Sequence, residues 1–88
     1  MTHDSVQRAE IYAAIDGERD YQDKKWPAHY HSNVEFLVYI RDYVDEALHL
    51  ASRNDDSVTI SACTNGLRKI AALAVAAMEQ NGVLPRTA

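Results

Sequence analysis

The stretch Leu67–Met78, which reads LRKIAALAVAAM, decides how this chain folds. It is the most apolar run in the sequence, and most of its residues favour the helical state. A helix that is apolar on nearly all sides has to be covered on nearly all sides. We therefore expect the other segments of the chain to pack around it.

The helix that contains this stretch is predicted to span residues 57–81. Its start follows the turn Asn54–Ser57, and Asn81 with Gly82 gives a C-terminal capping signal. Two apolar stripes run along it. The first, with the alternating steps of three and four that an antiparallel helix pair requires, contains Ile60, Cys63, Leu67, Ile70, Ala74 and Ala77, and the second contains Ala71, Val75 and Met78.

A second helix is predicted over residues 33–53. Ser32 followed by Glu35 matches a capping box, in which each side chain binds the other residue's backbone N–H. The predicted contact face is a stripe of Leu37, Ile40, Val44, Ala47, Leu48 and Ala51, widened by Phe36, Tyr39, Tyr43 and Leu50.

The first helix is predicted over residues 4–24, with Asp4 or Ser5 as its cap and Pro27 as its stop. Its main stripe holds Ile11, Ile15, Gln22 and Trp26. Gly17 weakens the middle of this helix, so it is expected to mark a bend or a close contact between helices.

These segments predict one all-α domain covering residues 1–88, in which the second and third helices form an antiparallel hairpin and the first packs across it. The alanines of the third helix permit close approach. Because its two apolar stripes exceed what two neighbours can cover, we expect a homodimer or a higher oligomer that completes the bundle between chains.

Composition excludes several classes of protein. The net charge of the 88 residues is −4, which argues against binding duplex nucleic acid through a basic face. No apolar run approaches the roughly 20 residues that a membrane-spanning helix needs. The N-terminal residues lead into a polar helix rather than a signal peptide, and the lone Cys63 suits a reducing compartment, so we expect a cytoplasmic protein without a membrane partner.

One candidate binding site combines cations with flat aromatic rings. Lys25 and Trp26 lie together, with Tyr21 and Arg19 before them and Tyr30 after them. Cations meet phosphates and aromatic rings stack on bases, so this combination suits a nucleotide. The alternative is that Trp26 fills the core and the neighbouring lysines are solvated.

A second candidate is acidic. Asp42 and Asp45 lie one helical turn apart, with Glu46 beside them and Glu35 two turns before, and paired carboxylates can hold Mg²⁺. The alternatives are a solvated helix face for the aspartates and a capping role for Glu35. His29 and His31 lack a third nearby ligand, so a surface or ligand-contacting role is favoured there over a metal site.

Arg68 and Lys69 interrupt the apolar third helix. A cation retained there should face a carboxylate such as Asp42 or Asp45, or else an anionic ligand. Arg41 is a further cation on the second helix. The sequence contains no Gly-rich phosphate loop, and neither Ser61 nor Cys63 has a base placed to activate it.

The order of these motifs resembles small MazG-like all-α proteins, many of them encoded by phages and prophages. The matching motifs are Glu18–Trp26, Asp42–Ala47 and Leu67–Val75. The resemblance implies an oligomeric, Mg²⁺-dependent nucleoside triphosphate pyrophosphohydrolase with acids on two helices. Carried over, the first acidic pattern falls on Arg41, Asp42 and Asp45, and the second falls near Arg68 or Lys69 and Ala71 or Ala72.

The expected metal site is thus incomplete, because cations replace acids in both patterns. We expect a MazG-like protein that binds or sequesters a nucleotide without cofactor or hydrolysis, through Arg68, Lys69, Arg41, Lys25, Trp26, Tyr21 and Tyr30. The first alternative is a Mg²⁺-dependent pyrophosphohydrolase that uses Asp42, Asp45, Glu46 and Glu35, with Asp42 and Asp45 holding the metal. The second alternative is an oligomeric helical module that binds another protein.

Overall fold

The computed structural model describes the backbone of residues 5–26, 29–52 and 56–87 and the side chains of residues 7–26, 29–52 and 60–87. It contains α1 (Ser5–Lys25), α2 (Asn33–Ala51) and α3 (Asp56–Asn81). The predicted all-α fold is therefore confirmed, and each described helix lies close to its predicted range. The predicted cap at Asp4 and the predicted stop at Pro27 fall outside the described residues.

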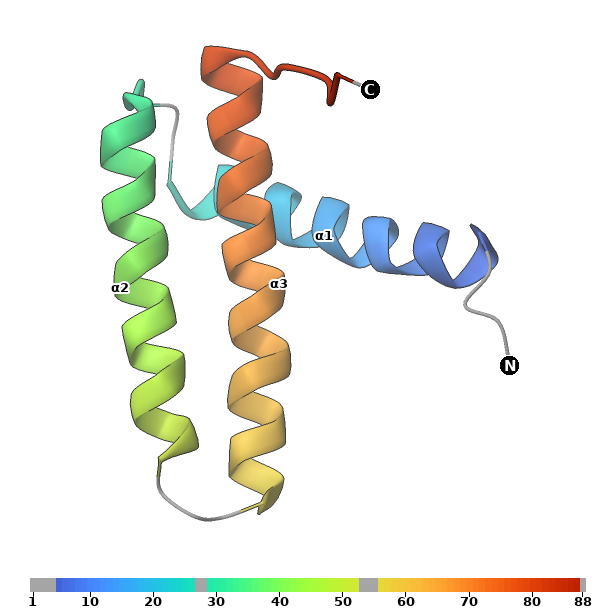
Figure 1. The fold of residues 1–88 in the computed structure, drawn as a ribbon, viewed down its shortest axis with the longest axis vertical. Coiled ribbons are helices and arrows are strands. Elements are labelled where there is room, and N and C mark those ends of the chain that lie inside the picture. Colours follow the sequence, from blue (N-terminus) through green and yellow to red (C-terminus); the bar gives the residue numbers. More distant parts are fainter. Residues whose placement is uncertain (1–4, 27–28, 53–55, 88) are drawn as a thin grey trace.

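The helices form a hairpin with one crossing helix (Figure 1). α2 and α3 run side by side in opposite directions, and α1 crosses α3 and extends beyond the hairpin. Among the described residues, α1 packs on α3 and not on α2. No described helix is long and apolar enough to cross a membrane.

The start of α2 has the predicted capping box. The N–H of Glu35 donates to Ser32 Oγ at 3.1 Å, and the N–H of Ser32 donates to Glu35 Oε1 at 2.9 Å. The backbone N–H of Ser32, followed by its side chain, lowers the pKa of Glu35 below its ordinary value. Capping therefore accounts for Glu35, as one of the two sequence alternatives predicted.

The face of α2 that packs on α3 is rotated relative to the predicted stripe. Phe36 is buried, whereas Leu37, Val44 and Leu48, which were predicted to lie in the contact face, are exposed. Both stripes are apolar and adjacent, so helical spacing alone does not distinguish them. Close packing on α3 selects the edge of the predicted face that carries Phe36, which was expected only to widen the stripe, together with Ala47 of the stripe itself.

The predicted contact stripe of α3 holds only in its C-terminal half, where Ile70, Ala74 and Ala77 are half-buried. Ile60, Cys63 and Leu67 are exposed, and the buried positions are Gly66, Ala72 and Ala76. Gly66 lies so close to α2 that an added Cβ atom would be 3.0 Å from the Cβ atom of Ala47. The smallest residues of α3, rather than its largest apolar ones, therefore meet the neighbouring helices.

The remaining predictions for α1 and α3 are met to different degrees. Gly82 has a φ of 93°, and its N–H donates to Met78 O at 2.8 Å, which is the predicted glycine cap of α3. Gly17 has no atom within 4 Å of an added Cβ, so it does not mark a close contact between helices. Ile11 of the predicted α1 stripe is exposed, while Gln22 of that stripe is buried.

Candidate functional site

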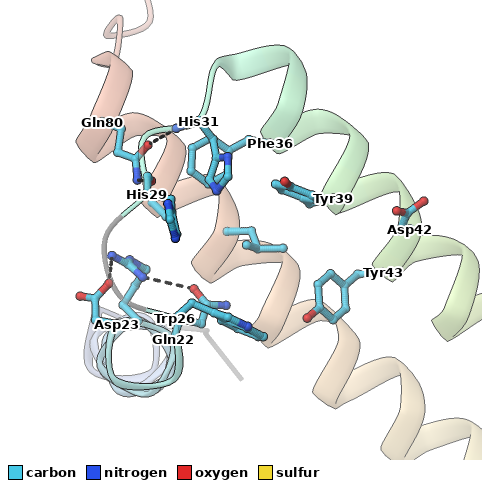
Figure 2. A pocket seen from close by; sticks show the side chains of 13 residues that line it. Gln22, Asp23, Trp26, His29, His31, Phe36, Tyr39, Asp42, Tyr43 and Gln80 are labelled. Carbon is cyan, nitrogen blue, oxygen red and sulfur yellow. Dashed lines mark hydrogen bonds and ion pairs between the residues drawn. The ribbon is translucent and has the colours of Figure 1, made fainter.

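A pocket of about 480 Å³ opens where the C-terminal half of α1, the connection to α2, and the adjoining faces of α2 and α3 meet (Figure 2). Six of its thirteen lining residues carry aromatic rings. His31 packs edge-on against Phe36 and Tyr39, with ring centroids 5.6 and 5.2 Å apart. Tyr43 lines the pocket one turn further along α2, and Trp26 reaches towards it from α1.

The connection that carries His29 and His31 is held against the end of α3. The N–H of His31 donates to Gln80 Oε1 at 2.9 Å, and Gln80 Nε2 donates to the carbonyl of His29 at 3.2 Å. Asn81 Nδ2 donates to the carbonyl of His31 at 3.0 Å. These side-chain amides satisfy backbone groups that no helix pairs, and they set the position of both histidines.

The polar end of the pocket lies on α1. Arg19 Nη1 donates to Gln22 Oε1 at 3.2 Å, and Arg19 also forms ion pairs of 2.8 Å with Asp23 and 2.7 Å with Glu79 on α3. Burial lowers the pKa of Arg19, but the hydrogen bonds and charges of Glu79 and Asp23 outweigh it and raise the pKa overall. Two carboxylates thus already neutralise this cation.

Residues from several of the predicted sites line this pocket, among them Arg19, His29 and His31. Trp26 belongs to the predicted cation and aromatic cluster, and Asp42 belongs to the predicted acidic site. Lys25 lies beside the pocket, since its Nζ atom is 5.0 Å from the Trp26 ring centroid and 5.6 Å from that of Tyr21. The structure therefore joins parts of both predicted sites.

Other predicted residues lie apart from the pocket lining. Asp45 and Glu46 do not line it, so the two aspartates of the predicted metal site do not share this cavity. Arg41 is exposed, and Tyr30 is 80% exposed while its hydroxyl donates to the carbonyl of Gln80 at 2.8 Å. No group of three His, Cys, Asp or Glu side chains within the described residues is placed to hold a metal ion.

Arg68 faces a carboxylate, as one of the sequence alternatives predicted, although that carboxylate is neither Asp42 nor Asp45. Arg68 Nε donates to Glu18 Oε1 at 2.8 Å, and Nη1 donates to Asn65 Oδ1 at 2.8 Å. The carboxylate opposite Arg68 thus comes from α1 and not from Asp42 or Asp45, because α1 crosses α3 at this point. Lys69 Nζ lies 6.0 Å from the ring centroid of Tyr43, so Lys69 is the one of the two that approaches a pocket residue.

Sequence reasoning missed several lining residues, chiefly Gln22, Tyr39, Tyr43 and Gln80. Gln22 gave a usable signal, because it is a polar residue at a position of the apolar α1 stripe. The two tyrosines were assigned to the helix contact face instead. Gln80 gave no local signal, since its partners are about 50 residues away in sequence.

Comparisons with protein families, with curated proteins and with solved structures find no match to this chain. The resemblance to MazG-like proteins therefore stays a prediction.

Proposed function

We propose that the pocket binds the base of a nucleotide or of a nucleotide-like small molecule, and that the protein holds this ligand without hydrolysing it. The observation that carries the proposal is the aromatic lining formed by Trp26, His31, Phe36, Tyr39 and Tyr43 around a cavity of about 480 Å³. A cavity of that size falls within the range of small-molecule sites, and flat rings stack favourably on such walls.

The polar groups of the lining suit a base better than they suit phosphates. Asp42 can accept and Gln22 can donate hydrogen bonds at the edge of a ring, in keeping with the few placed polar groups of a typical site. Arg19 is already paired with Asp23 and Glu79, so it has little charge to offer. We propose that phosphates would lie outside the cavity near Lys25, the cation next to Trp26.

Binding without hydrolysis is favoured over the pyrophosphohydrolase alternative by the position of the acids. A metal-dependent hydrolase needs several carboxylates directed at one ion beside the phosphates. Here Asp42 lines the cavity and Asp45 does not. The proposal also keeps the homo-oligomer, with the nucleotide as the small-molecule partner, and a MazG-like, phage-type origin.

Trp26 supplies a direct test, because it is the only tryptophan in the chain and it lines the pocket. Its fluorescence should change saturably when a binding nucleobase, nucleoside, nucleotide or cyclic nucleotide is titrated, both with Mg²⁺ and with EDTA. The variant Tyr39→Leu should weaken binding by roughly 5- to 150-fold, which corresponds to about 1–3 kcal/mol for one stacked base.

The matched control is Tyr12→Leu, because Tyr12 is 62% exposed on α1 and does not line the pocket. It should leave the affinity unchanged. If no compound of the panel alters the emission of Trp26, the proposal is wrong. A response that requires Mg²⁺ and is accompanied by pyrophosphate release would replace it with the hydrolase alternative.

A further inference from the structure

An exposed apolar surface lies on the side of the α2–α3 hairpin away from the pocket. We call it the back face, and define it by Leu37, Val44 and Leu48 on α2 with Ile60, Leu67 and Met78 on α3. All six side chains are between 36% and 67% exposed. Single exposed apolar residues are ordinary, but stripes on two neighbouring helices that run together are not.

Helical geometry places the α2 stripe away from the pocket. Each residue turns about 100° around the axis, so Leu37, Val44 and Leu48 lie about 140–180° around α2 from Tyr39. Tyr39 lines the pocket. The stripe therefore points away from the cavity.

The α3 stripe lies on the same side of the hairpin. Ile60, Leu67 and Met78 lie about 160–180° around α3 from Ala76, which lines the pocket. Leu67 stands between Gly66, which faces Ala47 of α2, and Arg68, which binds Glu18 of α1. Leu67 therefore faces neither α2 nor α1, and α1 crosses the hairpin on the side opposite the back face.

The accessible surface area of the chain is larger than that expected for a folded monomer of its mass. A folded monomer of 9.9 kDa is expected to expose about 5,200 Å². The accessible surface here is 7064 Å². The difference is on the order of 1,900 Å², against about 800 Å² that each partner buries in a standard dimer. The projecting end of α1 and the C-terminal residues contribute to this excess, and the six exposed apolar side chains of the back face contribute to it as well.

We infer that the back face binds the back face of a second copy of this chain, so that two hairpins form a four-helix bundle. This inference rests on the homo-oligomer proposed above and gives its interface. A two-fold axis brings the same surface from both copies together, which suits a face whose apolar stripes match in chemistry. Arg41 and Asp45 border the α2 stripe one turn apart, so each copy offers both charges to its partner.

The first measurement is the mass of the native protein in solution without ligand, for which we expect twice 9.9 kDa. A helical protein with the mass of one chain would overturn both the oligomer and its interface. Because no ligand is present, this result is independent of whether Trp26 responds to nucleotides.

The second measurement uses Cys63, the only cysteine, which is exposed in the single chain and lies about 140° around α3 from Ala76. In the dimer the back face covers it, so a water-soluble maleimide should modify it about tenfold more slowly, or slower still, than in the unfolded chain. A dimer whose Cys63 reacts at the unfolded rate would use another surface, which would overturn the interface while leaving the oligomer intact.

The variant Leu48→Glu should convert the dimer to single chains, whereas Leu84→Glu should leave the mass unchanged. Leu84 is 93% exposed beyond α3, so it is the matched control. A Leu48→Glu protein that stays a dimer would overturn the inference. If that variant fails to fold, the accessibility of Cys63 in the unaltered protein decides.

Discussion

At the scale of single residues, the start of α2 shows how one side chain sets local structure. Glu35 accepts from the N–H of Ser32, and its carboxylate also lies 3.7 Å from Nδ1 of His31. Hydrogen bonds to the charged form favour that form, which is why the pKa of Glu35 is lowered. The cap thereby links the folded state to the ionisation of one exposed acid.

The first prediction concerns the pH dependence of this cap. A carboxyl whose pKa is lower in the folded state stabilises the fold above its unfolded pKa, near 4.5, and that contribution is lost as the pH falls through the folded pKa. The variant Glu35→Gln should therefore be less stable than the unaltered protein at pH 6–7. Urea unfolding across pH 3–7 should show the two curves converging at acid pH, and parallel curves would contradict the prediction.

Arg68 carries a second prediction at this scale. Its partner Glu18 is only 10% exposed, so removing the cation leaves a nearly buried carboxylate without its ion pair. We expect Arg68→Gln to lower the free energy of unfolding by about 1–3 kcal/mol. The double variant with Glu18→Gln should lose less than the sum of the single losses.

The control for this pair is Arg8→Gln, an exposed cation on α1 outside the pocket and the back face, whose loss should change stability by no more than about 0.5 kcal/mol. Ligand affinity should be retained in Arg68→Gln, because Arg68 does not line the pocket. A large loss of affinity with unchanged stability would return Arg68 to the binding site that the sequence predicted.

At the scale of elements, the distance between α2 and α3 is set by small residues. Gly66 and Ala47 allow the two backbones to approach so closely that a Cβ atom added at Gly66 would lie 3.0 Å from that of Ala47, which is shorter than an ordinary van der Waals contact. Glycine costs helix stability, up to about 1 kcal/mol relative to alanine. At Gly66 that cost is offset by the packing that the close approach allows.

The third prediction compares two glycines within helices. Gly66→Ala should destabilise the protein, since the new Cβ atom would lie 3.0 Å from that of Ala47 and the helices would have to separate. Gly17→Ala meets nothing within 4 Å and should stabilise by about 0.5–1 kcal/mol. Thermal unfolding compares the midpoints of the two variants. A stabilising Gly66→Ala would contradict the prediction and would show that α2 and α3 can move apart at little cost.

At the scale of the whole molecule, the single chain has a small core. The buried apolar residues of the described chain are Phe36, Ala72 and Ala76, and two of these are alanines. The radius of gyration is 14.7 Å, whereas a compact chain of this length is expected near 12 Å. A chain with so little buried apolar surface gains stability by burying more of it in an assembly.

The fourth prediction follows from that dependence. If folding and association are linked, the unfolding midpoint should rise with protein concentration, by about 3–6 °C for each tenfold increase in a dimer of this size. Thermal unfolding at three concentrations provides the measurement. The folded monomeric control is Leu48→Glu where it remains helical, and a midpoint that is independent of concentration in the unaltered protein would contradict the prediction.

The candidate site shows where sequence reasoning succeeds and where it stops. Trp26 and Asp42 were both selected from sequence as site residues, in two separate candidate sites, and the fold brings them to one cavity. Arg68 was selected with the wrong partner, because Glu18 reaches it only through the crossing of α1 over α3. Contacts between residues about 50 positions apart leave no periodic signal in either segment.

Local sequence patterns are enough to predict the helices, their approximate ends, the capping box at Ser32 and the glycine cap at Gly82. These depend on interactions within a few residues, which a local pattern records directly. Which apolar stripe faces inward and which side chains share the pocket depend instead on packing between the helices. On α2 and α3 more than one stripe is apolar, and the choice between them rests on close packing at Gly66 and Ala47 and on where α1 crosses.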